Sequence, residues 1–420
     1  MPSPPRSPDF LILGAGVAGL AAARYLRQRN LNPLVLEARN RIGGRIATLH
    51  PAQTPIPVEL GAEFVHGLHP DLWTLLDEAH LPAVEARGEH LTATPDGPRE
   101  STRFDDMAPL FEALSRATPD QSFDHFLRHT DADPEAKTAI TGFIEGFNAA
   151  RKELVGTDWL NTESRAASEI DEDRNFRLLS GYDAVPRHLA QNLDIRLETP
   201  VRRLRWQKDE VIAETDTAEF RAPRAIVTVP FALLAANGLP IHPEPAALTN
   251  ARRAIATGHA LRVTFRFPTA VWEKYPRLSF LHADQPFPVW WTPYPVRTTL
   301  ITGWAAGPKA DALAARSEAE IVAIALASLR HALHEDPGPP DAVFFHDWRH
   351  DPWSLGAYSY GLVNGAAARR ALADPIDETL CFAGEAVCPA GHMGTVHGAI
   401  SSGLAAAHAL LPRELQHLPA

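Results

Sequence analysis

The chain has 420 residues, of which 45% are hydrophobic and 22% charged, a composition typical of a globular protein large enough for two domains. Its formal net charge of −11 argues against nucleic acid as a partner, because phosphate backbones are bound by basic surfaces. The two cysteines form neither a disulfide framework nor a zinc pattern, which favours a reducing compartment. No signal segment opens the chain and no apolar run is long enough to span a bilayer, so we expect a cytoplasmic protein without a membrane partner.

The first predicted elements make a βαβ unit. Residues 9–13 are predicted to form a buried strand, residues 17–29 a helix and residues 33–37 a second strand. A glycine turn joins the first strand to the helix, and an acidic residue ends the second strand. This order is typical of a dinucleotide-binding site.

Each glycine of this turn has a predicted task. Gly14 allows the tight turn, Gly16 lets a pyrophosphate approach the backbone, and Gly19 lets helix and strand pack closely. Free N–H groups at the start of the helix attract phosphate, and Glu37 is placed to accept hydrogen bonds from ribose hydroxyls. The glycine turn alone does not separate FAD from NAD.

The next segment, residues 41–45, sets two glycines between Arg41 and Arg45. Such a backbone can approach a cofactor closely, with guanidinium groups beside it that match phosphate geometry. It resembles the arginine–diglycine motif of the two-dinucleotide-binding flavoproteins, which NAD enzymes lack.

The later elements are predicted from periodicity. Residues 71–180 are expected to be largely helical, and the mixed charges at 171–177 are interpreted as a solvated face. Further predicted elements are strands over residues 195–230, an antiparallel sheet over 260–305, an amphipathic helix at 317–334, a strand entering a loop at 380–385 and a last helix at 396–411.

From Phe10 to about Leu410 the chain resembles the flavin-containing amine oxidases, a family that includes monoamine, polyamine and L-amino acid oxidases and histone demethylases. The matching blocks, in order, are residues 14–37, 41–45, 59–67, 179–185, 225–230, 353–361, 382–385 and 394–399. The resemblance implies an α/β fold with a Rossmann-like, two-dinucleotide-binding FAD domain and a second, α+β substrate domain on a mixed or antiparallel sheet. We expect the FAD domain to comprise residues 1–72, 178–236 and 372–420, and the substrate domain residues 73–177 and 237–371.

The same resemblance implies cofactor-binding roles for residues spread along the chain. They are Gly14, Gly16, Gly19, Glu37, Arg39, Gly44, Arg45, Gly61, Ala62, Val201, Trp353, Glu385, Thr395 and Val396. Trp353 would pack against the flavin ring, and the helix that begins at Thr395 would aim its N-terminus at the pyrimidine edge. A cysteine that attaches flavin covalently in monoamine oxidases is replaced here by Ala357, so we predict non-covalent FAD.

The implied reaction removes a hydride equivalent from the carbon beside an amine, which must first be neutral. Aromatic walls favour the neutral amine by desolvation. Tyr358 is the predicted wall. Thr395 stands where monoamine oxidases have a second tyrosine, and a threonine at that position is similar to polyamine oxidases and histone demethylases. His66 matches a substrate-contacting histidine of polyamine oxidases, with a structural histidine as the alternative interpretation.

One departure concerns the lysine that usually holds a water against flavin N5. Here that position is Arg262, which keeps the charge but differs in shape. The electron acceptor is therefore left open between O2 and another compound.

Two carboxylates, Glu63 and Glu145, are candidate ammonium partners, with ordinary surface or helix-face carboxylates as the alternative. The pairs at 346–347 and 350–351 match no known metal spacing. The predicted function is FAD-dependent oxidation of a polyamine-like or other alkyl amine. Two alternatives are a same-fold enzyme acting on a non-amine substrate, such as a desaturase, and a flavin-bound interaction protein with weakened catalysis.

Overall fold

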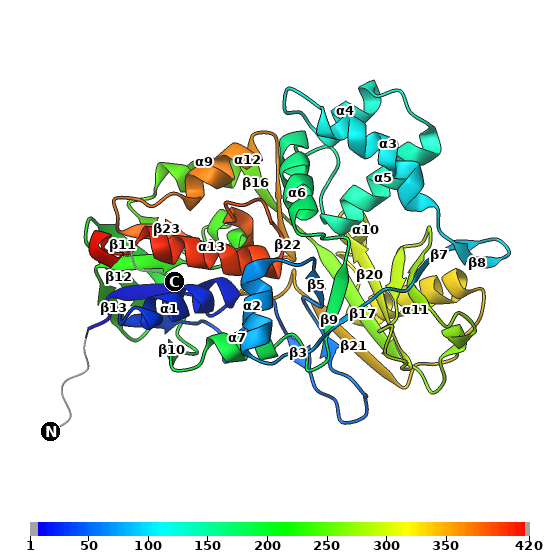
Figure 1. Cartoon of the computed structure of the whole chain (residues 1–420), viewed down its shortest axis with the longest axis horizontal. Coiled ribbons are helices and arrows are strands. Elements are labelled where there is room, and N and C mark those ends of the chain that lie inside the picture. The colour runs from blue at the N-terminus through cyan, green and yellow to red at the C-terminus, as the bar shows by residue number, and fades with distance from the viewer. Residues whose placement is uncertain (1–6, 416–420) are drawn as a thin grey trace.

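The computed structural model describes residues 7–415. Figure 1 shows two regions side by side, one holding both ends of the described chain and the other a large, mostly antiparallel sheet beneath a group of helices. The predicted α/β architecture is confirmed. The exact borders of the two predicted domains stay a prediction.

The first region is built on a parallel five-stranded sheet. Its order is β10 (Asp194–Arg196), β2 (Pro33–Leu36), β1 (Phe10–Leu13), β14 (Arg224–Val227) and β23 (Leu380–Phe382). All residues of β1 and β2 are buried, as expected for central parallel strands with both faces covered. The opening βαβ unit is thus confirmed to within a residue at each end.

Two helices far apart in sequence cover this sheet together. Helix α1 (Val17–Gln28) and helix α13 (Val396–Ala409) pack along each other, as Figure 1 shows. Small residues make the close approach possible, because a Cβ on Gly403 would lie 2.1 Å from the carbonyl oxygen of Ala18. A four-stranded sheet lies beside them, in the order β13 (Glu219–Ala222), β12 (Glu210–Thr215), β11 (Val201–Gln207) and β15 (Ile241–His242).

The second region is built on a seven-stranded sheet. Its order is β21 (Ala342–Asp347), β17 (Ala260–Arg266), β20 (Leu300–Ala306), β19 (Val289–Trp291), β18 (Leu278–His282), β7 (Glu89–Thr94) and β8 (Gly97–Glu100). Every pair is antiparallel except β18 with β7. Helix α11 (Glu318–Leu333), which starts at a capping box of Ser317 and Glu320, packs its apolar side on this sheet.

Four helices form a separate layer above the sheet in Figure 1, with their own apolar core. They are α3 (Arg103–Ser115), α4 (Phe123–His129), α5 (Pro134–Phe147) and α6 (Thr157–Glu169). Helix α2 (Pro70–Glu78) lies beside α13 instead. None of the helices within residues 7–415 is both long and apolar enough to cross a bilayer.

The expectation of a largely helical segment over residues 71–180 is only partly right. The strands β6 (Ala83–Glu85), β7, β8 and β9 (Asn175–Leu178) interrupt the helices. β9 pairs with both β5 (Phe64–His66) and β6, and β7 pairs with β18. Because most of these partners are distant in sequence, the local pattern carries little sign of the pairing.

Candidate active site

A continuous cavity of about 2200 Å³ is lined by residues of both regions. Pockets for drug-sized ligands usually occupy roughly 300–1,000 Å³, so this one has room for a dinucleotide and a substrate together. Sixteen of the seventeen predicted site residues line it. The exception is Gly19, which lies behind the turn where helix and strand meet.

The glycine turn has the geometry expected of a pyrophosphate cradle. Gly14 has a φ of +109°, which L side chains rarely adopt. A Cβ on Gly19 would lie 2.0 Å from the carbonyl oxygen of Gly14, whereas a Cβ on Gly16 would meet no atom within 4 Å. Gly16 therefore leaves the N-terminus of α1 open to the cavity, and no acidic side chain in the first turn offsets its positive end.

The carboxylate of Glu37 is buried at the end of β2. It accepts hydrogen bonds from the N–H groups of Ala15 (2.7 Å) and Arg39 (2.8 Å), so it is fixed between the glycine turn and the following loop. Each oxygen retains a lone pair for a ribose hydroxyl.

Arg39 joins this loop to a distant segment. Its guanidinium donates to both oxygens of Asp351, at 2.6 and 2.7 Å, and to the hydroxyl of Ser354. Burial alone would raise the pKa of Asp351, but hydrogen bonds from His346 and Arg39 hold it far below its usual range. The bidentate pair holds the segment that carries Trp353 at the cavity wall.

A second charged pair joins the arginine–diglycine segment to the C-terminal part of the chain. Arg45 donates to the carbonyl of Ala357 (2.7 Å) and to Glu385 (2.8 Å). Glu385 also accepts from the hydroxyl of Ser359 and the N–H of Gly394. These bonds fix the loop that precedes α13.

The N-terminus of α13 faces the cavity. Thr395 caps the helix by accepting the N–H of Gly398 at 3.0 Å, and the first turn holds no acidic residue. Tyr358 lies next to this loop, because a Cβ on Gly394 would come within 3.4 Å of its ring. Thr395, Val396 and Tyr358 therefore meet at one stretch of the cavity wall.

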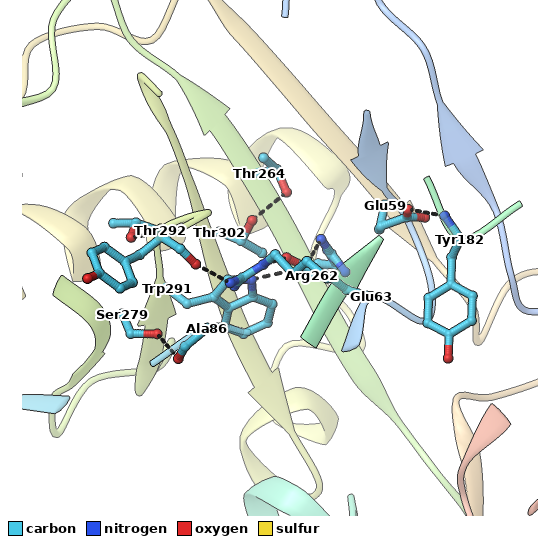
Figure 2. Close-up of polar contacts among 12 residues, drawn as sticks. Glu59, Glu63, Ala86, Tyr182, Arg262, Thr264, Ser279, Trp291, Thr292 and Thr302 are labelled. Carbon is cyan, nitrogen blue, oxygen red and sulfur yellow. Dashed lines mark hydrogen bonds and ion pairs between the residues drawn. The ribbon is translucent and has the colours of Figure 1, made fainter. Parts of the chain in front are cut away.

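Arg262 lies on β17 within a buried charged network, which Figure 2 shows in part. Its guanidinium donates to the carbonyl of Gly61 (3.0 Å) and forms an ion pair with Glu63. Glu63 also accepts from Trp291 (3.0 Å) and from Arg177 (2.9 Å). Burial would raise the pKa of Glu63, but the two arginines hold it below its usual value.

This network corrects the interpretation of Glu63 as a surface or helix-face carboxylate. Glu63 lines the cavity and is paired with Arg262 and Arg177, so it is not free to pair with an ammonium ion. Arg177, in the run of charges interpreted as a solvated face, is buried as well.

His66 is placed beside Phe64 and Phe147, with ring centroids 5.9 and 6.2 Å away. Burial lowers its pKa to about 4, although a hydrogen bond with Asn175 opposes the shift. The ring is neutral near pH 7 and lines the cavity.

Two carboxyl groups in the cavity wall carry no motif and escaped sequence reasoning. They are Glu163 on α6 and Glu172 just before β9. Burial, and for Glu163 also the neighbouring Glu172, raises their pKa values to about 8 and about 7. Among the described residues no basic group forms an ion pair with either. Burial also raises the pKa of Glu145, which lines the same cavity.

The lining fits a flavin dinucleotide. Two open glycines, Gly16 and Gly384, leave space that a Cβ would fill, and the N-termini of α1 and α13 both face the cavity. Glu37 and Arg45 provide the acidic and basic contacts expected for a ribose and a pyrophosphate. Within residues 7–415 no group of side chains is arranged to hold a metal ion; Asp347 pairs with Arg349 instead.

Comparison with known proteins settles the family. The profile of the family described as flavin containing amine oxidoreductase matches residues 17–411. The chain belongs to this family. It is therefore a flavoprotein, an FAD-dependent oxidoreductase that acts on amines.

Individual relatives agree over nearly the whole chain. Polyamine oxidase 4 of Oryza sativa subsp. japonica is 30% identical, over 95% of this chain and 88% of its own. Human lysine-specific histone demethylase 2 is 27% identical, over 92% of this chain and 51% of its own. The structure of wild-type putrescine oxidase bound to putrescine has a TM-score of 0.84 and 23% identity, with 96% of this chain and 98% of that chain covered. Cyclohexylamine oxidase from Brevibacterium oxydans IH-35A also has a TM-score of 0.84, with 22% identity and 96% and 99% of the two chains covered. These two likenesses show the fold.

Proposed function

We propose that this amine oxidoreductase acts on polyamine-like substrates, that is, alkyl amines with more than one ammonium group. The observation that carries the proposal is the pair Glu163 and Glu172 in the cavity wall, without basic partners among the described residues. An ammonium ion bound beside these groups lowers their pKa values, so its binding favours the carboxylate forms, which attract the cation strongly in a partly dry cavity. Their raised pKa values also suit them to take a proton from an ammonium ion near neutral pH, which leaves the neutral amine that the reaction requires.

The walls at the reacting end favour the same chemistry. When bound, the flavin accepts a hydride equivalent from the carbon beside the nitrogen, and the imine product hydrolyses in water. Tyr358 donates its hydroxyl hydrogen to the carbonyl of Phe147, which fixes its ring in the cavity wall. Burial raises the pKa of Tyr358, so the ring stays uncharged and desolvates the amine.

A panel of amines tests the substrate class. Under anaerobic conditions 1,4-diaminobutane and longer polyamines are expected to bleach the flavin, and butylamine to do so less efficiently. Glu163→Gln is expected to lower kcat/KM for the diamine about tenfold, with a smaller effect on butylamine. The matched control is Glu169→Gln, an exposed position on the same helix. If no amine bleaches the flavin, or if butylamine is preferred and Glu163→Gln changes nothing, the proposal is wrong.

The FAD is proposed to be held without a covalent bond. Ala357 lines the cavity at the position where a cysteine would attach it, and Cys381 and Cys388 are buried outside the lining. Acid precipitation of the holoenzyme is expected to leave the yellow cofactor in the supernatant. Colour that stays with the precipitated chain would contradict this.

The electron acceptor is proposed to be a compound other than O2. The support is Arg262, which stands where the family usually has a lysine. Its guanidinium is hydrogen-bonded to Gly61 and paired with Glu63, so it does not offer the free ammonium group of a lysine. Reoxidation of the reduced enzyme by air is expected to be slow, and Arg262→Lys to accelerate it about tenfold. Stopped-flow absorbance measures both rates; fast reoxidation of the wild type in air excludes the idea.

The location is proposed to be cytoplasmic, with two free, buried cysteines as support. Cell fractionation beside a cytoplasmic marker tests it, and recovery in an exported fraction would refute it.

A further inference from the structure

Seven aromatic side chains form a closed circuit of ring contacts, which we name the aromatic belt. Two come from β5, one each from β7 and β18, one from α3 and two from α5. In order around the circuit the centroid distances are His66–Phe64 5.9 Å, Phe64–Phe280 5.7 Å, Phe280–His90 4.8 Å, His90–Phe104 5.5 Å, Phe104–Phe143 6.1 Å, Phe143–Phe147 5.3 Å and Phe147–His66 6.2 Å. All seven line the cavity. The belt thus links the strands of the second region to the helical layer above them.

The belt is not part of a closed core. Five of its members are half-buried, and Phe104 and Phe147 are 45% and 46% exposed. Aromatic rings usually lose most of their contact with water on folding, and their burial is strongly favourable. A ligand group inside the belt would bury ring surface that the fold itself leaves open.

The charges behind the belt do not favour a second ammonium ion in it. The guanidinium of Arg177 lies 4.5 Å from the centroid of Phe64. His282 lies beside His90, with ring centroids 5.6 Å apart, and burial together with the charge of Arg103 lowers the pKa of His282 to about 3. The charge of Arg177 is balanced by Glu63, while that of Arg103 would repel a cation.

The belt itself contributes no negative charge. Burial lowers the pKa values of His66 and His90, so both rings are neutral near pH 7. Glu63, beside Phe64, is paired with Arg177 and Arg262. Glu145, which lies on α5 between Phe143 and Phe147, also lines the cavity, and burial raises its pKa, which favours its uncharged form. Glu100 and Asp106 line the cavity too but are exposed to solvent, where their fields are screened. The cavity therefore has an acidic part at Glu163 and Glu172 and an aromatic part at the belt, where Glu145 is the neighbouring carboxyl group on α5.

We propose that the aromatic belt is a subsite for an uncharged aromatic or alicyclic ring carried by the amine substrate. The proposal rests on the amine-oxidising function and narrows it: the substrate combines an ammonium group, held near Glu163, with a ring held in the belt. Offset and edge-to-face contacts with a ligand ring are the geometry that such side chains favour.

Two amines that differ only in a ring test the subsite. For the wild-type holoenzyme, kcat/KM for N-benzyl-1,4-diaminobutane is expected to exceed that for 1,4-diaminobutane. Phe104→Ala is expected to lower the ratio of the two values about tenfold, mainly through KM of the benzyl compound. Phe280→Leu, which keeps most of the volume, is expected to lower the ratio less. The control is Leu197→Ala, a similarly exposed apolar residue that does not line the cavity.

A second probe separates this proposal from the proposed function. N-benzylacetamide has the ring but no basic nitrogen, and it is expected to perturb the flavin absorption spectrum of the oxidised holoenzyme. Glu163→Gln should leave this binding unchanged and Phe104→Ala should weaken it about tenfold. If the probe binds in this way but no amine is oxidised, the subsite stands and the proposed function fails. If amines are oxidised but the probe does not bind, or the ratio is the same in Phe104→Ala as in the wild type, the subsite is wrong.

Discussion

Charged residues are treated differently at the two ends of the cavity. At the nucleotide-binding end Arg39 pairs with Asp351 and Arg45 with Glu385, so charge is balanced and the loops are fixed. At the substrate end Glu163 and Glu172 have no basic partner among the described residues, and their pKa values rise. Balanced pairs hold the shape of a site that binds one constant cofactor. Unbalanced carboxyl groups lower the stability of the folded protein and are available to a cationic ligand.

The strongest test of the nucleotide-binding end is Gly19→Ala. Its Cβ would lie 2.0 Å from the carbonyl oxygen of Gly14, and these backbone atoms cannot move apart without a large cost in free energy. A destabilisation of more than about 3 kcal/mol and loss of the yellow cofactor are expected. Urea unfolding and flavin absorbance measure the two effects. Gly16→Ala is the control: its Cβ meets no protein atom, so it should fold normally and lose only cofactor affinity.

Asp351→Ala tests whether the balanced pairs hold this end together. It would leave the guanidinium of Arg39 without its carboxylate, with only 11% of the arginine side chain exposed. The expected loss of stability is about 3 kcal/mol. Arg116→Ala removes an exposed pair with Glu112 and is expected to change stability by at most about 0.5 kcal/mol. Equal effects of the two substitutions in urea unfolding would contradict the contrast.

Glu163→Gln tests the unbalanced end through pH. The pKa of Glu163 is raised from 4.5 to about 8, so the folded state retains a proton that the unfolded chain releases. Stability contributed by this group is therefore present below pH 4.5 and is lost as pH rises through 8. The variant should match the wild type at pH 5 and exceed it by about 2 kcal/mol at pH 9. Thermal unfolding at both pH values checks this, and a parallel decline of the two proteins would refute it.

The smallest expected effect is at Thr395, where the two ends meet. Thr395→Ala removes the side-chain cap of α13 and is expected to lower stability by about 1 kcal/mol. Thr395→Ser retains the oxygen and should restore most of the loss. If the serine variant is as unstable as the alanine variant, the methyl group and not the cap is what matters.

The nucleotide-binding end was predictable because its information is local. A strand, a glycine turn and a helix within residues 10–28 fix Gly14, Gly16 and Gly19 by chain geometry alone. Glu37 follows from the length of the next strand. The resemblance of short blocks to a known family extended this to Arg45, Thr395 and Tyr358, which the fold brings to one cavity from positions hundreds of residues apart.

Only the tertiary structure decided the substrate end. The sequence determined which residues are charged or aromatic. The charges of residues 171–177 predicted a solvated face, but the pairing of β9 with β5 places Arg177 of this segment against Glu63. Glu163 and Glu172 became functional candidates because α6 and the segment just before β9 place them in one cavity wall. The aromatic belt likewise forms only because α3 and α5 bring their rings to those of strands β5, β7 and β18. Burial and the proximity of distant segments set pKa values and ring contacts, and neither is written in a local pattern.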